Sequence, residues 1–120
     1  YVFEYECLKL KEHNLTHLIH SIDKHFEKGE YPGWDITSFD EMGNKIFIEV
    51  KSTKGKIINN LEITENEWNA ANREREQYFI YLVTNALNEK IKISEKINNP
   101  KELVENGEIE ILPSVYKLEL

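Results

Sequence analysis

The stretch that decides the fold runs from Gly33 to Lys51 and reads GWDITSFDEMGNKIFIEVK. Apolar and polar residues alternate in both of its halves, which is typical of two half-buried strands, here 34–39 and 45–53. Between them, Asp40 at the first turn position and Gly43 at the fourth suit a type I turn that ends in a left-handed glycine. The stretch therefore predicts an antiparallel β-hairpin.

The register of this hairpin brings charged residues onto one face. The rungs that follow from the turn are Asp40–Asn44, Phe39–Lys45, Thr37–Phe47 and Asp35–Glu49. Residues directly opposite each other have Cβ atoms about 5 Å apart, so Asp35 and Glu49 are expected to face each other closely. Lys51 shares their face about 7 Å farther along the strand. The other face is apolar and is expected to enter the core: Ile36, Ile46, Ile48 and Val50.

Two opposed carboxylates repel, and a hard divalent cation would compensate for this. Mg²⁺, with Mn²⁺ as a possible substitute, takes carboxylate and water oxygens and lowers the pKa of bound water. A lysine beside it would position or deprotonate the attacking water in phosphodiester hydrolysis. An E-x-K pattern alone also occurs on solvated strands with alternating charge. The aspartate in register, Asp35, makes a metal site about as well supported as that alternative.

The rest of the chain predicts further elements around the hairpin. These are a helix over 1–12, a strand over 17–22, a loop over 23–33, a helix from a capping box at Thr64–Glu67 to about Glu76, a buried strand from Tyr78 to Thr84, a short helix from Asn99-Pro100 to near Gly107, and strands over 109–112 and 115–120. Strands on either side of a capped helix indicate an α/β or α+β sheet domain.

The composition bounds the class of protein. The chain has 120 residues, 40% of them apolar and 31% charged, which fits one soluble globular domain. No stretch approaches the ~18 apolar residues of a membrane span, and the acidic start differs from a secretory signal. The single Cys7 excludes an internal disulfide and favours a reducing, cytoplasmic setting. Because the first residue is Tyr1, we expect a fragment of a larger protein.

The net charge of −7 argues against a free-standing nucleic-acid-binding protein, because phosphate neutralisation requires cations. It is compatible with an enzyme whose acids surround a cation and whose DNA affinity comes from a neighbouring domain. Lys54 and Lys56 leave the second hairpin strand and either contact phosphate at the mouth of the site or form a solvated loop. Gln77 and Tyr78 are expected to support the site from the end of the helix that begins at the Thr64–Glu67 capping box.

Four histidines, at positions 13, 17, 20 and 25, offer a weaker metal hypothesis. His13 and His17 have the spacing of zinc ligands on one helix face, but the strand expected over 17–22 separates them. We therefore favour surface or loop roles, with His20 or His25 able to approach DNA phosphates.

The run GWDITSFDEMGNKIFIEVKST at 33–53 resembles the NO VEIN C-terminal family, a domain related to Mrr-type restriction nucleases of the PD-(D/E)xK kind. The resemblance extends to Val2–Glu6, to Ile63-Thr64 with Glu67, to Tyr78–Val83, and to Pro113 and Tyr116. It implies a restriction-endonuclease-like fold, in which helices flank a central mixed sheet. By this similarity Asp35, Glu49 and Lys51 fall on the nuclease triad, and the acid of the first helix falls on Glu6 or before Tyr1.

The resemblance therefore implies a Mg²⁺-dependent endonuclease domain acting on DNA within a restriction or defence protein. Asp35, Glu49 and the backbone carbonyl of Val50 would hold the metal, Lys51 would position the water, and Glu6 would add a further contact. Cleavage of both strands would need two centres, which suggests a homodimer. The alternative is a module on the same fold that binds nucleic acid or a protein without cleaving it.

Overall fold

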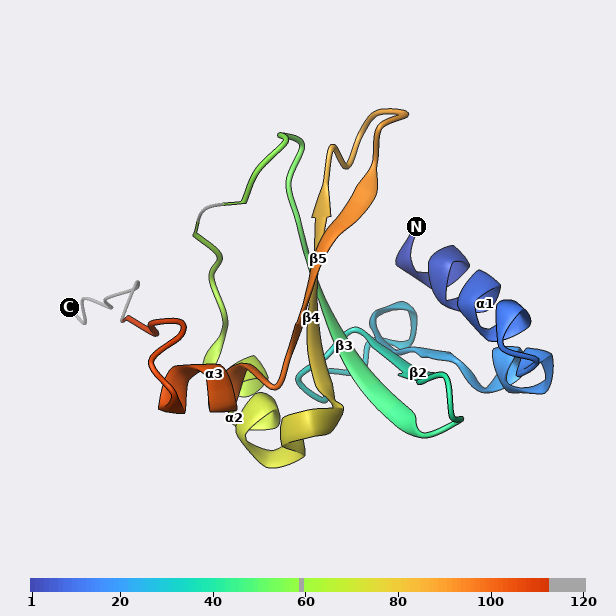
Figure 1. Cartoon of the computed structure of the whole chain (residues 1–120), viewed down its shortest axis with the longest axis horizontal. Helices are drawn as coiled ribbons and strands as arrows, with labels where there is room; N and C mark the ends of the chain where they lie inside the picture. The colour runs from blue at the N-terminus through green and yellow to red at the C-terminus, as the bar shows by residue number, and fades with distance from the viewer. Residues whose placement is uncertain (59, 113–120) are drawn as a thin grey trace.

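The computed structural model describes residues 1–58 and 60–112. Its elements in chain order are α1 (Val2–Glu12), η1 (Thr16–Ser21), β1 (Asp23–Lys24), η2 (His25–Lys28), β2 (Ile36–Phe39), β3 (Lys45–Ser52), α2 (Glu65–Glu74), η3 (Arg75–Gln77), β4 (Tyr78–Thr84), β5 (Lys92–Asn98) and α3 (Pro100–Glu105), where η marks a 3-10 helix. Figure 1 shows them around one sheet, with α1 on one side and with α2 and α3 on the other.

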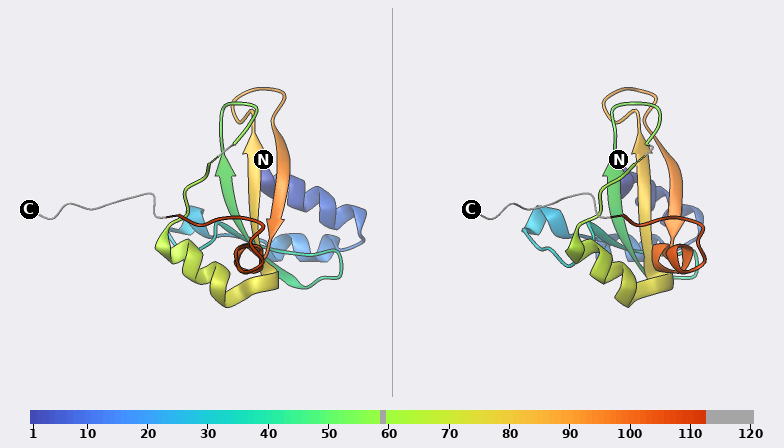
Figure 2. Two further views of the ribbon diagram at one scale, coloured as in Figure 1. Left: turned by 60° about the vertical axis from the view of Figure 1, so that its left-hand side comes forward. Right: turned by 90° about the vertical axis from the view of Figure 1, so that its left-hand side faces the viewer.

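The sheet has five strands in the order β1-β2-β3-β4-β5. Neighbouring strands are antiparallel except for β3 and β4, which are parallel and connected through α2. The predicted mixed sheet flanked by helices is therefore confirmed. Figure 2 shows the twist of the sheet and the separation of its helical layers. Among the described residues, no helix combines the length and apolar character that crossing a bilayer requires.

The hairpin forms as the sequence predicts. Phe39 pairs with Lys45 and Thr37 with Phe47. The Asp40 carboxylate accepts the backbone N–H of Asn44 at 2.8 Å and so closes the turn. Gly43 takes a φ of +86°, the left-handed conformation that glycine adopts without steric cost. The turn therefore sets the register, and the register decides which side chains share a face.

Each face of the sheet has its own apolar cluster. On the α1 side the buried residues are Val2, Ile36, Ile46, Ile48, Tyr81 and Val83. On the α2 side they are Ala70, Ala71, Tyr78, Ile80 and Leu82. The strand β4 contributes to both clusters, as expected for its continuous apolar sequence. The sheet therefore has a separate apolar core on each of its two faces.

Three sequence predictions are wrong or incomplete. Residues 17–22, predicted as a strand, lie mostly in η1, because Leu15, Leu18, Ile19 and Ile22 follow a helical spacing of three and four. The predicted loop over 23–33 contains β1 and η2. Residues 109–112 form no strand, and the strand predicted over 115–120 lies outside the described residues.

The sequence did not predict the strand β5, because apolar and polar residues do not alternate regularly along it. The pairing of β5 with β4 is irregular between Leu82 and Val83 of β4. Five of the seven side chains of β5 are exposed, and three of these are charged. Charged, irregular edge strands resist pairing with other chains. Such a strand gives a weak apolar signal.

Candidate functional site

Asp35 lies immediately before β2, at the point where the hairpin ladder ends. The ladder stops at Ile36–Ile48, one rung short of the predicted pair, and the Asp35 N–H donates to the Ile48 carbonyl at 2.8 Å. The Asp35 carboxylate instead accepts the backbone N–H of Val50 at 2.8 Å through Oδ2. Because β2 begins too late to pair with Val50, this side chain replaces the missing rung. It ties Asp35 to the strand that carries Glu49.

Glu49 is buried on β3, with 5% of its surface exposed. Burial, followed by the negative charges of Asp35 and Glu67, raises the pKa of its carboxyl from 4.5 to about 8. The Lys51 amine, 3.3 Å from Glu49 Oε2, offsets only part of this effect. The carboxyl therefore sits where a further positive charge would be stabilising.

Lys51 lies between two carboxylates. Its Nζ is 2.7 Å from Glu67 Oε1 and 3.3 Å from Glu49 Oε2. Burial opposes the charged amine, but the hydrogen bond that Lys51 donates to Glu67 and the charge of Glu49 outweigh it and raise the pKa of Lys51. The lysine is therefore protonated in this arrangement and holds the two acids together.

Glu67 is the site residue to which the sequence interpretation gave no catalytic role. It occupies the third position of α2 and forms the predicted capping box with Thr64. Burial acts against its charge, but the Lys51 and Thr64 N–H hydrogen bonds lower the pKa of its carboxyl below the usual value. The capping box signal accounts for its place on the helix. It does not reveal that the same carboxylate reaches the sheet.

Asp35, Glu49 and Glu67 carry oxygen atoms of the kind that a hard divalent cation binds. Asp35, Glu49 and Glu67 act together on Tyr78, because their charges, after burial, raise the pKa of its hydroxyl well above the usual value. When Glu49 is ionised, three carboxylates and one lysine leave an excess of negative charge in a partly buried site. Within a strand, the N–H and C=O of one residue point to the same edge, so the Val50 carbonyl points toward the side on which Asp35 binds the Val50 N–H. Oxygen donors of this kind are the preferred ligands of Mg²⁺.

The loop before Asp35 is held in place by contacts with β4 and α2. Tyr78 donates its hydroxyl hydrogen to the Gly33 carbonyl at 2.8 Å. Gly33 has a φ of +108°, and a Cβ there would come within 2.5 Å of the Ala70 Cβ of α2. The side chain of Asn66 donates to the Tyr31 carbonyl at 3.0 Å. The helix α2 and the strand β4 therefore both help to place Asp35, and Tyr78 supports the site as expected.

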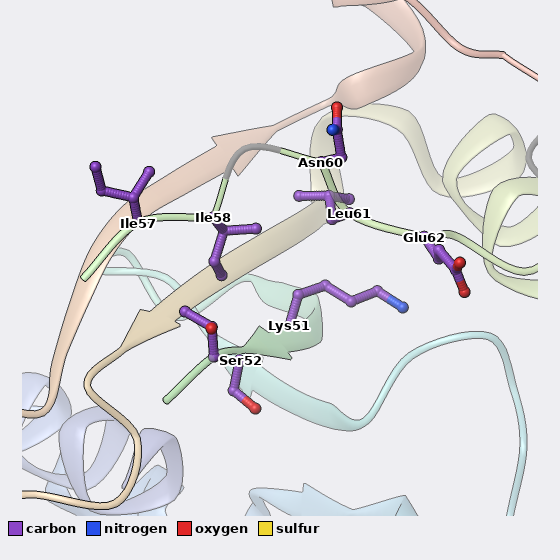
Figure 3. Close-up of a pocket in the computed structure, with 8 residues that line it drawn as sticks. Lys51, Ser52, Ile57, Ile58, Asn60, Leu61 and Glu62 are labelled. Carbon is purple, nitrogen blue, oxygen red and sulfur yellow. The ribbon is translucent and has the colours of Figure 1, made fainter. Parts of the chain in front are cut away.

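A groove adjoins Lys51 on the side of the segment between β3 and α2. Its volume is about 380 Å³. Figure 3 shows Lys51 extending beneath Leu61 toward the side on which Glu62 lies. Its lining combines apolar and polar side chains: Lys51, Ser52, Thr53, Ile57, Ile58, Asn60, Leu61 and Glu62. Lys54 and Lys56 are exposed on the same segment, so phosphate contact remains a prediction for both.

Two predicted site residues are not brought to this centre. Glu6 lies on the other face of the sheet, where its carboxylate accepts hydrogen bonds from Lys9 (2.6 Å), Ser38 (2.7 Å) and Tyr81 (3.1 Å). Gln77 donates to the Lys45 carbonyl at 3.1 Å. Lys45 is six residues before Lys51 on β3, about 20 Å away. The predicted roles of Glu6 and Gln77 in the site are therefore not supported.

Among the described residues, the group of acids and histidines whose ligand atoms all lie within 4.8 Å of one another is Asp23, His25 and Glu30, and not the three carboxylates near Lys51. The Lys28 amine is 2.7 Å from Asp23 and 3.7 Å from Glu30, so it already supplies a positive charge there. His25 Nε2 is hydrogen-bonded to Thr37 at 2.7 Å. We assign this group to the packing of the loop against β2.

Searches of curated proteins and of solved structures find no match to the chain. The family model described as protein NO VEIN, C-terminal, matches residues 1–95. That range includes Asp35, Glu49, Lys51 and Glu67, and it covers most of the chain. The chain therefore belongs to the NO VEIN C-terminal family.

Proposed function

We propose that this domain is a Mg²⁺-dependent endonuclease of the PD-(D/E)xK kind, which hydrolyses DNA phosphodiester bonds. The observation that carries the proposal is that Asp35, bound to the Val50 N–H, and Lys51, 3.3 Å from Glu49, flank the buried Glu49, whose charge Lys51 only partly compensates. A purely structural carboxylate pair would be expected to have an ion-pair partner for each acid. This excess of negative charge instead suits a cation-binding centre.

In this proposal Asp35 and Glu49 hold the metal together with the Val50 carbonyl. Bound Mg²⁺ would lower the pKa of water and polarise the phosphoryl group. Asp35 is oriented by the Val50 N–H, and Lys51 is held 3.3 Å from Glu49, so its amine would lie beside the proposed metal ligands. The lysine would orient the attacking water and stabilise negative charge on the phosphate. The groove beside Lys51 offers a path for the nucleic acid.

The wider context is also part of the proposal. With a net charge of −7, the domain would depend on other domains of a larger restriction or defence protein for most of its DNA affinity. A homodimer would supply the two centres that double-strand cleavage needs. A cytoplasmic location fits the single cysteine.

The competing role is a module that binds nucleic acid or protein without cleavage, and the negative charge favours it. Plasmid incubation with Mg²⁺ or Mn²⁺ separates the two roles. We expect cleavage by the wild type and its loss in Asp35→Ala and Lys51→Ala, with the exposed Glu89→Gln as a control that still cuts.

Calorimetric titration with Mn²⁺ tests the metal centre without relying on turnover. We expect binding by the wild type and by Glu89→Gln, and loss of binding in Glu49→Ala. Equal cleavage by wild type and site variants would refute the endonuclease proposal. A full-length protein that neither binds Mn²⁺ nor cuts DNA would also refute it.

A further inference from the structure

Glu67 performs two tasks with one oxygen atom. Its Oε1 accepts the backbone N–H of Thr64 at 3.0 Å, which completes the cap of α2, and the Lys51 amine at 2.7 Å. A glutamate at this position of a capping box needs only the helix end as its partner. Here its side chain is only 17% exposed, because it turns from the helix toward the sheet. The cap of α2 is therefore joined to the proposed centre.

The Lys51 amine lies closer to Glu67 than to Glu49. The amine is 0.6 Å closer to Glu67 than to Glu49, at 2.7 Å against 3.3 Å. Charge-assisted hydrogen bonds of 2.7–2.9 Å are the strong ones, whereas 3.3 Å indicates a weaker contact. Glu67 is thus the principal anchor of the amine. Glu49 keeps a carboxylate that Lys51 only partly neutralises.

We infer that Glu67 is the positioning residue for Lys51: it holds the amine near Glu49 but prevents a close ion pair that would compete with a divalent cation. This inference rests on the proposed endonuclease function. Without the Glu67 charge, Lys51 has one carboxylate within reach and would move onto Glu49. A cation would then have to displace the lysine before it could bind.

The same helix also places Asp35. Asn66, the neighbour of Glu67, binds the Tyr31 carbonyl, and Ala70 packs against Gly33 in the loop that leads to Asp35. One rigid element therefore sets both Lys51, through Glu67, and Asp35, through the loop. We accordingly expect the geometry of the centre to depend on α2 as well as on the hairpin.

Glu67→Gln separates the two tasks of this residue. Glutamine is as suitable as glutamate for the capping box, so the helix end keeps its hydrogen bond while the charge opposite Lys51 is removed. Thr64→Ala does the reverse, because it removes the side-chain cap and leaves the ion pair. Glu65→Gln removes the same charge from an exposed position in the first turn of α2 and is the charge control.

Three measurements on the folded protein test the inference. In Glu67→Gln we expect Mn²⁺ affinity to fall about tenfold by calorimetry, as for loss of one charge-assisted hydrogen bond. DNA turnover should also fall about tenfold or more, with KM nearly unchanged, whereas Glu67→Asp should recover part of it. Acetic anhydride should acetylate Lys51 faster in Glu67→Gln, as measured by mass spectrometry, because one carboxylate instead of two then stabilises the unreactive ammonium form. Thr64→Ala and Glu65→Gln should match the wild type in all three.

The outcomes distinguish this inference from the proposed function. A tenfold lower Mn²⁺ affinity and slower turnover in Glu67→Gln, with neither change in Thr64→Ala or Glu65→Gln, would support it. Unchanged Mn²⁺ affinity and unchanged Lys51 acetylation in Glu67→Gln would overturn it, even if the wild type cleaves DNA. If the wild type neither cuts nor binds Mn²⁺, the endonuclease proposal fails. In that case Lys51 acetylation still tests whether Glu67 anchors the amine. Equal acetylation rates in Glu67→Gln and Glu65→Gln would overturn the inference as well.

Discussion

Replacing Glu49 with glutamine should make the metal-free domain more stable at alkaline pH than the wild type. The Glu49 carboxyl is buried beside Asp35 and Glu67, and its pKa rises from 4.5 to about 8. In the unfolded chain the same carboxyl ionises near its ordinary value. The folded state therefore retains a proton that the unfolded state has lost, over the range between these two values.

The sign follows from this difference in proton binding. Where the folded state binds more protons, stability falls as pH rises, so the contribution of Glu49 is complete below pH 4.5 and is lost as the pH passes 8. At 1.36 kcal/mol per pKa unit, the shift corresponds to about 5 kcal/mol, of which about 3–4 kcal/mol falls between pH 5 and 8. Glutamine does not titrate, so the variant lacks this decline.

Urea unfolding in EDTA at pH 5, 6.5 and 8 measures the effect. We expect the free energy of unfolding of Glu49→Gln, relative to the wild type, to rise by about 3–4 kcal/mol across this range. Glu89→Gln, an exposed acid-to-amide change, should run parallel to the wild type. Excess Mg²⁺ should reduce the decline in the wild type and leave Glu49→Gln unchanged. Parallel curves for the wild type and Glu49→Gln in EDTA would refute the reasoning.

Three further substitutions test the scaffold. Gly33→Ala should lower stability by about 2–4 kcal/mol in urea unfolding, because its Cβ would lie 2.5 Å from that of Ala70; Gly29→Ala, with open space around it, should cost clearly less. Glu6→Ala should cost about 3–5 kcal/mol by stripping partners from a buried network, yet leave Mn²⁺ affinity unchanged in calorimetry; a changed affinity would contradict its place on the other face. Asn99→Ala should cost about 1 kcal/mol in the same unfolding assay, through loss of the α3 cap, and no loss would contradict that role.

The hairpin could be predicted from sequence because its determinants are local. The turn from Asp40 to Gly43 sets the register, and the alternation of residues then assigns each side chain to a face. The prediction was less accurate at the end of the ladder. The regular pairing stops before Asp35, and its carboxylate binds the Val50 N–H instead, a side-chain contact that no periodicity predicts.

The less predictable elements lack such local determinants. In η1 the apolar residues fit both a short alternating run and a helical turn, and only packing against the rest of the chain decides between them. The strand β5 depends on pairing with β4 across an irregular register. The sequence of β5 is mostly polar, so its extended conformation is set by pairing with β4 and not by burial of its own side chains.

The sequence predicted Glu6 as the third acid of the site, but Glu67 is the acid that lies there. The reason is how the two faces of the hairpin are covered. The face opposite Glu49 carries Ile36, Ile46 and Ile48, and these side chains need an apolar cover. The helix α1 supplies it through Val2, so any acid on α1 that points inward must meet the isoleucine face. There Glu6 can be buried only because hydroxyls and Lys9 satisfy its charge.

The connection between β3 and β4 has the opposite consequence. These strands are parallel, so the segment between them must cross over the sheet, and its helix α2 packs against Ile80 and Tyr78 on the face of Glu49. An acid in the first turn of α2 then meets Lys51 near the end of β3 without any special loop. The face of each acid is therefore decided by which helix covers which side of the hairpin. A further acid near the centre of this fold is therefore expected on the crossover helix α2.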